Sequence, residues 1–244
     1  MSEPREYALY DMTWEDAGER IPDADYVVLP CGSIEQHSTH LPLSVDSIRA
    51  EQLTERLAER APEHDLSVLT LPTLAYGYSE HHMTFPGTIT LMPDTYRNVV
   101  VEIGESMAAH GAERFALVNC HGGNRQPLKL AADRLQRDHG LQVHVVHWTN
   151  FARDALQEVF GEDWGHAGDH ETSAIEVLAP HLVREGKKEP QTVTESGDTR
   201  QYEYFSDLTE QGGLGDPTNA DPEVMAEIIA ETTDSILESL AEDR

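Results

Sequence analysis

The stretch ADYVVLPCGSIEQHSTHLPLSVD, residues 24–46, decides the fold class. It opens with a short apolar run, from Ala24 to Pro30, and the run breaks at Gly32. A run of this length followed by a turn residue predicts a buried strand that ends in a loop. Asp46 can then cap a helix, because the apolar residues that follow it recur at spacings of three and four. These apolar residues are Ala50, Leu53, Leu57 and Ala61.

The same alternation of strand and helix continues along the chain. Further strands are expected at residues 66–71, 115–119 and 141–148, and helices at residues 94–110 and 125–139. The strand at 115–119 is also closed by a glycine turn, at Gly122 and Gly123. Strands that alternate with helices predict an α/β fold with a mainly parallel sheet and helices on both of its faces.

The chain changes character at about residue 184. Residues 184–221 are polar, and we interpret them as a surface segment that covers a site or another subunit, because functionless loops of this length are uncommon in compact domains. Asp221 and Pro222 then supply an N-cap and a first-turn proline for a final helix. A length of 244 residues allows one large domain or two small ones, and we expect a single domain over residues 1–244.

The net charge excludes two classes of partner. Asp and Glu number 45 against 17 Lys and Arg, which gives a formal net charge of −28. This field would repel a nucleic acid or an anionic membrane surface, so neither is an expected partner. The acidic residues are spread along the chain, which is typical of the acidic shell that keeps a protein hydrated in a salty cytoplasm. We therefore favour a halophilic source over an ordinary acidic protein.

The chain shows no sign of membrane insertion or secretion. No stretch approaches the roughly 20 apolar residues of a membrane span. The start, MSEPREYALY, has neither the basic nor the apolar region of a secretory signal. We expect a cytoplasmic protein, in which Cys31 and Cys120 are free thiols because that compartment is reducing.

Four potential metal ligands follow the first expected strand. The motif PCGSIEQHSTHLPLSVD, residues 30–46, contains Glu35, His37, His40 and Asp46. Open α/β sheets bind ligands beyond the carboxyl ends of their strands, so this loop lies where a site is expected. Mixed carboxylate and imidazole ligands suit zinc, manganese or iron(II). The alternative is a set of scattered polar residues with Asp46 only capping the helix, but four such groups in twelve residues favour a metal site.

A second motif, VNCHGGN at residues 118–124, follows the strand at 115–119. His121 emerges where the chain turns, and the two glycines remove side chains that would block a metal or substrate. The alternative is a phosphate cradle, since glycines before a helix expose backbone N–H groups to anions. The segment lacks the lysine of a P-loop and the spacing of a dinucleotide fingerprint. We therefore prefer His121 as a metal ligand.

A third motif, GHAGDHETS at residues 165–173, precedes another helix. It is explained in part as a helix start, with Asp169 as the cap and Glu171 opposing the macrodipole. That interpretation does not require His166, for which a catalytic role as acid or base and a structural role are equally open.

A fourth segment, YGYSEHHMTFPGTITL at residues 76–91, places three polar side chains next to a Pro-Gly turn. These are Ser79, His81 and His82. A single histidine is more often structural than a ligand, so this segment is a candidate for the wall of a pocket only.

Five strings resemble the landmark motifs of the creatininase family in their order. They are GSIEQHSTHLPLSVD, SEHHMTFPGTITL, NCHGGN, HAGDHETS and GGLGDP, between residues 32 and 217. The resemblance implies a three-layer α/β/α domain with a metal centre, in a cyclic homo-oligomer such as a hexamer. Members of the family hydrolyse amide bonds of small molecules: they open the creatinine ring, deformylate a ribosylaminopyrimidine phosphate in deazaflavin and flavin synthesis, or trim the precursor peptide of a redox cofactor.

The resemblance also implies roles for matching residues. The metal ligands would be Glu35, His37, Asp46 and His121, with Asp46 as the bridge if two ions bind. Creatinine-hydrolysing members carry a glutamate ligand at the position of Gly123, so here Glu171 would have to supply that carboxylate, or the second ion is weak or absent. Creatinine as the substrate is therefore in doubt. Cys120 replaces the usual glycine before the turn histidine.

The chemistry expected is metal-assisted hydrolysis by one or two divalent ions per subunit. A metal-bound water loses its proton near neutral pH and attacks the amide carbon. His166 or Glu171 would pass a proton to the leaving nitrogen, while Ser79 and His82 would orient the substrate.

Three functions remain open from the sequence. A cyclic-amide hydrolase for creatinine or a relative needs a small closed pocket, with Trp148 and Trp164 on its walls. A nucleotide deformylase needs a basic phosphate site, for which the candidates are Arg49, Arg125 and Lys129. A non-catalytic metal-binding protein would leave no open coordination position for water.

Overall fold

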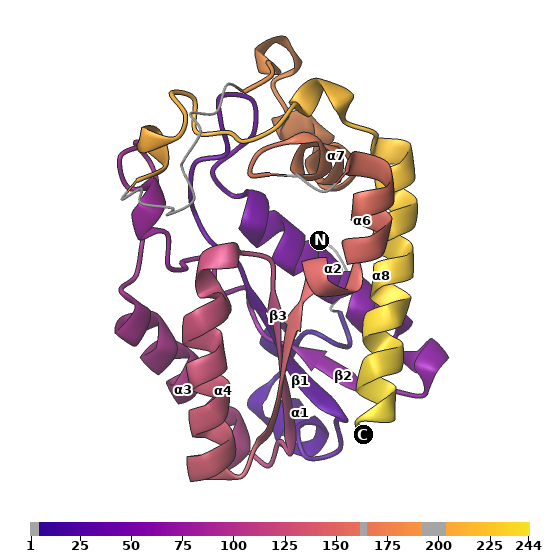
Figure 1. The fold of residues 1–244 in the computed structure, drawn as a ribbon. Coiled ribbons are helices and arrows are strands. Elements are labelled where there is room, and N and C mark those ends of the chain that lie inside the picture. The colour runs from indigo at the N-terminus through magenta and orange to yellow at the C-terminus, as the bar shows by residue number, and fades with distance from the viewer. Residues whose placement is uncertain (1–4, 162–164, 192–203) are drawn as a thin grey trace.

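A computed structural model describes residues 5–161, 165–191 and 204–244. Within these ranges the strands form one parallel sheet in the order β2-β1-β3-β4. The strands are β1 (Tyr26–Cys31), β2 (Val68–Thr70), β3 (Arg114–Asn119) and β4 (Gln142–His147). Figure 1 shows this sheet between two groups of helices, which confirms the expected three-layer α/β/α arrangement.

Two apolar clusters lie on opposite faces of the sheet. The helices of one face are α2 (Val45–Arg60), α6 (Arg153–Phe160) and α8 (Pro222–Glu242), and those of the other are α1 (Trp14–Arg20), α3 (Pro93–Ala109) and α4 (Arg125–His139). Strand β1 contributes to both, since Tyr26 and Val28 pack with α2 and α8 whereas Val27 packs with α3 and α4. Successive strand residues point to opposite faces, so an apolar strand requires cover on both sides.

The start of α2 corrects one prediction. Ser44 occupies the N-cap position, and Asp46 is the second residue of the helix, with a buried side chain. The carboxylate of Asp46 points to His121 and Arg49 rather than to the backbone of its own helix. The interpretation of Asp46 as a simple helix cap is therefore wrong.

The final helix, α8, begins as predicted. The Asp221 side chain accepts a hydrogen bond from the backbone N–H of Val224 at 3.1 Å, and Pro222 takes the first position, where its missing N–H is not needed. The buried residues of this helix include the predicted apolar face: Met225, Ile229, Ile236 and Leu240. Of the polar segment at 184–221, residues 192–203 lie outside the described ranges.

The carboxyl ends of the strands meet at one edge of the sheet. Cys31, at the end of β1, is in register with Asn119 of β3, and Asn119 is in register with His147 of β4. The loop after β1 and the turn after β3 therefore start side by side, beneath α7 (Asp169–Leu178) in Figure 1. This edge is where the sequence motifs are brought together.

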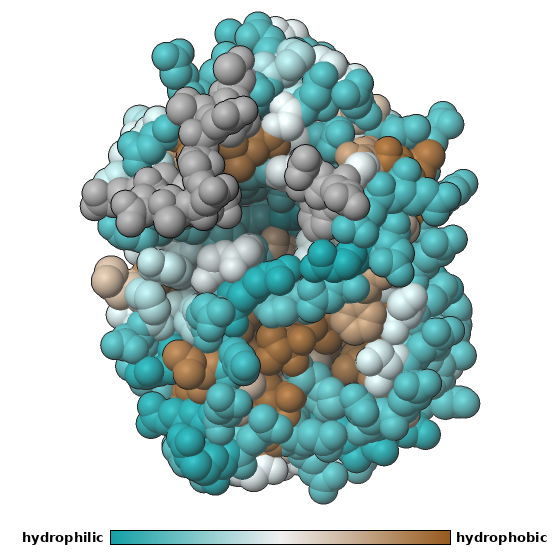
Figure 2. All heavy atoms as spheres, in the orientation of Figure 1, coloured by the Kyte–Doolittle hydropathy of each residue, from teal (hydrophilic) through white to brown (hydrophobic). Residues whose placement is uncertain are grey.

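Cys31 and Cys120 are free, as expected, and both are buried. Burial raises the pKa of each thiol to about 12, so both remain protonated near neutral pH. Figure 2 shows that hydrophilic side chains cover most of the visible face, with the larger hydrophobic areas in its lower half and smaller ones at the upper right. Among the described residues no helix combines the length and hydropathy of a membrane span.

Candidate metal centre and active site

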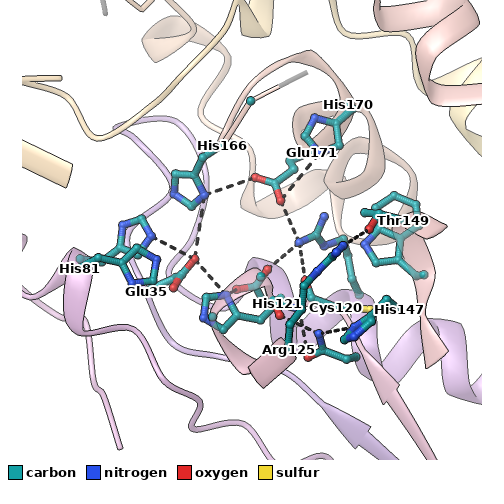
Figure 3. Close-up of a pocket in the computed structure, with 18 of the residues that line it drawn as sticks. Glu35, His81, Cys120, His121, Arg125, His147, Thr149, His166, His170 and Glu171 are labelled. Atoms are coloured by element: carbon teal, nitrogen blue, oxygen red, sulfur yellow. Dashed lines mark hydrogen bonds and ion pairs between the residues drawn. The ribbon is translucent and has the colours of Figure 1, made fainter. Parts of the chain in front are cut away.

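Glu35, Asp46 and His121 converge at the carboxyl edge of the sheet. His121 Nδ1 lies 3.0 Å from Asp46 Oδ2 and 3.3 Å from Glu35 Oε1, and all three side chains are buried. Ligand atoms bound at about 2.0–2.2 Å to one ion lie roughly 3.0–3.6 Å apart. The three groups therefore have the spacing of a metal site. Figure 3 shows Glu35 and His121 turned toward each other.

A backbone carbonyl determines which nitrogen of His121 faces the carboxylates. His121 Nε2 lies 2.9 Å from the carbonyl oxygen of Tyr78, to which it donates. This bond fixes the hydrogen on Nε2 and leaves Nδ1 for a metal ion. Burial lowers the pKa of His121, but Glu35 and Asp46 outweigh burial and raise it well above its usual range. The pocket thus favours positive charge at this point.

Gly123 is required by this arrangement. A Cβ atom at residue 123 would lie 2.1 Å from the Tyr78 carbonyl oxygen and 2.5 Å from His121 Nε2. Any side chain here would push His121 off its carbonyl partner. A glutamate at this position is therefore incompatible with the observed turn, and a second carboxylate has to come from elsewhere.

His37 and Glu171 supply a second group beside the first. His37 Nε2 lies 3.5 Å from Glu171 Oε2 and 3.7 Å from Asp46 Oδ1. This buried nitrogen has no hydrogen-bond partner among the residues described. A buried polar atom without a partner is costly, and a cation between His37 and the carboxylates removes that cost. Asp46 turns one oxygen to His121 and the other to His37, as a bridging ligand would.

Arg49 is already engaged by the carboxylates. Its Nη2 lies 2.5 Å from Asp46 Oδ1 and 2.8 Å from Glu171 Oε1, and it donates to the carbonyl of Cys120 at 2.8 Å. Burial alone would lower the pKa of Arg49, but the charges of Glu171 and Asp46 outweigh burial, and the net effect is a pKa above the usual value of arginine. The prediction that Arg49 binds a phosphate is therefore wrong, because Asp46 and Glu171 already neutralise its charge inside the site.

His166 approaches the same cluster from the loop before α7. Its Nε2 donates to the carbonyl oxygen of Gln36 at 2.7 Å, which turns Nδ1 toward Glu35 Oε1 at 3.9 Å and Glu171 Oε2 at 3.8 Å. Burial, and next the charge of His37, lower the pKa of His166. A neutral ring with its lone pair facing the cluster can accept a proton or bind an ion, and it belongs to two of the potential ligand groups.

The N-terminus of α7 holds Glu171 rather than being capped by Asp169. Gly168 is the N-cap residue and Asp169 begins the helix, so the expected cap role of Asp169 is wrong. Glu171 Oε2 accepts a hydrogen bond from the backbone N–H of Ala167 at 2.7 Å. Burial would raise the pKa of Glu171, but Arg49 and His37 outweigh it and lower the pKa.

Gln36 joins three loops and was not singled out by any sequence pattern. Its Nε2 donates to His82 Nδ1 and to the carbonyl of Gly212, both at 2.8 Å. Gly212 has a φ of +85°, and a Cβ there would lie 2.0 Å from Gln36 Oε1. The glycine pair in GGLGDP is the one signal in the sequence that points to this close approach.

Ser79 and His82 lie beside Glu35. Ser79 is fully buried, and its hydroxyl donates to Glu35 Oε2 at 2.6 Å, behind the pocket surface. His82 lines the pocket, with Nε2 at 3.5 Å from Glu35 Oε1. Trp148 also lines it, and the guanidinium of Arg49 lies over the Trp148 ring at 5.3 Å. Trp164, the other predicted wall residue, lies outside the described ranges.

A pocket of about 580 Å³ opens onto these groups. Its volume is within the range of roughly 300–1,000 Å³ typical of small-molecule sites. Other residues that line it include Asn119, Arg125, His147 and Thr149. Arg125, His147 and Thr149 appear together on one side of Figure 3. Lys129 is exposed on α4 and does not line this pocket.

Comparison with known proteins agrees with the geometry. The sequence profile of the Creatininase family, described as creatinine amidohydrolase, matches residues 10–240. The chain belongs to the creatininase family. It is therefore a creatininase-family amidohydrolase, which argues against the purely metal-binding alternative.

Similar creatininase-family members differ in the substrates that their names give. A creatinine amidohydrolase from Pseudomonas putida is 32% identical over 192 residues, covering 71% of this chain and 72% of that protein. A mycofactocin precursor peptide peptidase from Mycobacterium tuberculosis (strain ATCC 25618 / H37Rv) is 33% identical over 225 residues, covering 88% and 84%. A solved creatininase with manganese in its title has a TM-score of 0.85 at 25% identity, covering 98% of this chain and 99% of that one.

Proposed function

We propose that the protein is a metal-dependent amidohydrolase that cleaves a non-peptide C–N amide bond of a small molecule. The observation that carries the proposal is the convergence of Glu35, Asp46 and His121 next to the partnerless nitrogen of His37. Mixed nitrogen and oxygen ligands suit zinc, manganese or iron(II). Similar solved structures include a manganese creatininase and one titled as a Zn-Zn type.

One ion would be held by Glu35, Asp46 and His121, and a second by His37 and Glu171 with Asp46 as the bridge. When bound, the metal supplies an ionised water and polarises the amide carbonyl. Glu171 serves as a ligand rather than a proton donor, because Arg49 and the Ala167 N–H both stabilise its ionised form. Ser79 holds Glu35 in place through its hydroxyl.

His166 moves the proton. Its Nε2–H is held by the Gln36 carbonyl, so Nδ1 is free to accept a proton in the pocket and pass it to the leaving nitrogen. Gln36 donates to His82 Nδ1, so the hydrogen of His82 is on Nε2, 3.5 Å from Glu35 Oε1. His82 lines the pocket there and would orient the substrate. In this assignment the proton carrier, His166, is a different residue from the five proposed metal ligands.

A second candidate function is cleavage of a short peptide. The mycofactocin precursor peptide peptidases, at 31–34% identity, favour it. The turn at Gly123, which cannot hold the glutamate of creatinine-hydrolysing relatives, weakens the case for creatinine itself.

The test is an activity screen of metal-loaded protein in molar KCl. The substrates are creatinine, creatine, a formylaminopyrimidine nucleotide and a short peptide. We expect hydrolysis of an amide that is lost with a chelator and restored by zinc or manganese. Hydrolysis that survives complete metal removal would contradict the proposal. Hydrolysis of the short peptide, with no hydrolysis of the other three substrates, would favour the second candidate.

A further inference from the structure

The far side of the pocket holds a cation that the metal centre does not use. Arg125 is the first residue of α4, and its Nη2 donates to Thr149 Oγ1 at 2.8 Å. His147, at the end of β4, lines the pocket beside them. Figure 3 shows the three residues grouped on one side, with Glu35 and His166 on the other.

Arg125 differs from Arg49, the other arginine among the described residues that line the pocket. Arg49 is paired with two carboxylates, whereas no acidic residue in the described ranges forms an ion pair with Arg125. The chain has 45 acidic residues against 17 basic ones, so carboxylates are not scarce. An unpaired guanidinium in a pocket is a binding group for an anion.

Arg125 does not stabilise the helix that it begins. The first turn of α4 contains no acidic residue, and a positive charge at a helix N-terminus opposes the helix dipole. The same N-terminus favours a negatively charged ligand. The position is therefore electrostatically suited to an anion and unfavourable for the arginine alone.

His147 adds a neutral donor. The amide nitrogen of Asn119 donates to the carbonyl of His121 at 2.7 Å and to His147 Nδ1 at 2.9 Å, while Asn119 Oδ1 accepts from the His121 N–H at 3.3 Å. These bonds fix the orientation of the amide, so the hydrogen of His147 is on Nε2. Burial, and then the charge of Arg125, lower the pKa of His147 to about 4, which keeps the ring neutral near pH 7.

We infer that Arg125, Thr149 and His147 form a subsite for an anionic group of the substrate, a carboxylate or a phosphate. The identification of that group as part of an amide substrate rests on the proposed function; the anion site itself does not. The substrate class is then an amide that carries an anion at the end remote from the scissile bond.

The experiment is calorimetric titration of zinc-loaded protein with inorganic phosphate and, separately, with succinate at fixed ionic strength. Arg125→Gln should weaken binding of the preferred anion at least tenfold, about 1.4 kcal/mol. Arg125→Lys should restore part of the affinity. Lys129→Gln, on the same helix but outside the pocket, should bind as the wild type does.

The outcomes separate the inference from the proposed function. Equal anion affinity in the wild type and Arg125→Gln, with both folded by circular dichroism, would overturn the subsite and place the anion on the metal. Failure of both anions to bind would also overturn it. Arg125-dependent binding in a protein without amidase activity would keep the subsite and contradict only the proposed function. A preference for phosphate or for succinate identifies the source of the charge.

Discussion

The two halves of the site are positioned by different parts of the fold. The sheet half is the name used here for Glu35, Asp46 and His121. Glu35 and His121 follow β1 and β3, and Asp46 lies in the first turn of α2, and the apolar residues of these elements form the core. The loop half is the name used here for His82, His166 and Gly212. The Gln36 amide donates to His82 and Gly212, and His166 donates to the Gln36 backbone carbonyl. Under the proposed function, the sheet half would hold the metal, and the loop half would transfer protons and orient the substrate.

The largest effect is expected in the sheet half. His121→Ala removes one of three donors to the first ion, so bound metal and activity should both fall to background, while β3 stays folded because its apolar core is untouched. Metal content by mass spectrometry and circular dichroism measure the two effects. His110→Ala, at an exposed helix end, is the matched control. Full metal content in His121→Ala would contradict the claim that the sheet half holds the metal.

A smaller effect is expected from His166 in the loop half. His166→Ala should lower the rate roughly 10²- to 10⁴-fold, the usual range for a lost general acid or base, and leave the metal content of the sheet half intact. Metal analysis and steady-state kinetics on the same sample decide the outcome. An empty site in His166→Ala would make His166 a ligand and merge the two halves.

Gly212 tests whether the loop half depends on Gln36. In Gly212→Ala the new Cβ meets Gln36 Oε1, and φ of +85° is unfavourable for alanine, so the free energy of unfolding should fall by roughly 1–3 kcal/mol. The melting temperature should drop by about 2–4 °C for each kcal/mol, with metal content unchanged. Gly186→Ala, where the Cβ meets open space, should melt like the wild type. Identical melting of both variants would show that the contact with Gln36 is not structural.

Salt is expected to have the smallest effect on the difference between the two halves, because it acts on the whole chain. The Debye length falls from about 30 Å at 0.01 M to about 3 Å at 1 M, so molar KCl should raise the melting temperature of a chain with a net charge of −28. The difference in melting temperature between the wild type and Gly212→Ala should stay constant, because the Gln36 clash is steric. A melting temperature that is flat from dilute buffer to molar KCl would contradict the halophilic interpretation.

The sheet half could be predicted from the sequence because each of its motifs follows an apolar strand. Parallel strands bring their carboxyl ends to one edge, so Glu35 and His121 had to be neighbours once β1 and β3 were recognised. The role of Asp46 was nevertheless predicted wrongly in one respect. It was expected to cap α2, but its side chain points toward His121.

The loop half could not be predicted in the same way. Gln36 meets Gly212 across 176 residues, and no periodic pattern records such a contact. Arg49 shows the same limit, because a basic residue in a helix gives no sign that two carboxylates neutralise it. Only the packing of α2 against α7 brings Arg49 to Glu171.

The most direct test of the account is a crystal structure of zinc-loaded protein with an anomalous difference map recorded at the zinc edge. We predict a peak about 2.0–2.2 Å from His121 Nδ1, Glu35 and Asp46, with His121 Nε2 still bonded to the Tyr78 carbonyl. A peak coordinated by His121 Nε2, or no zinc between these three residues, would contradict the assignment of the sheet half as the metal site.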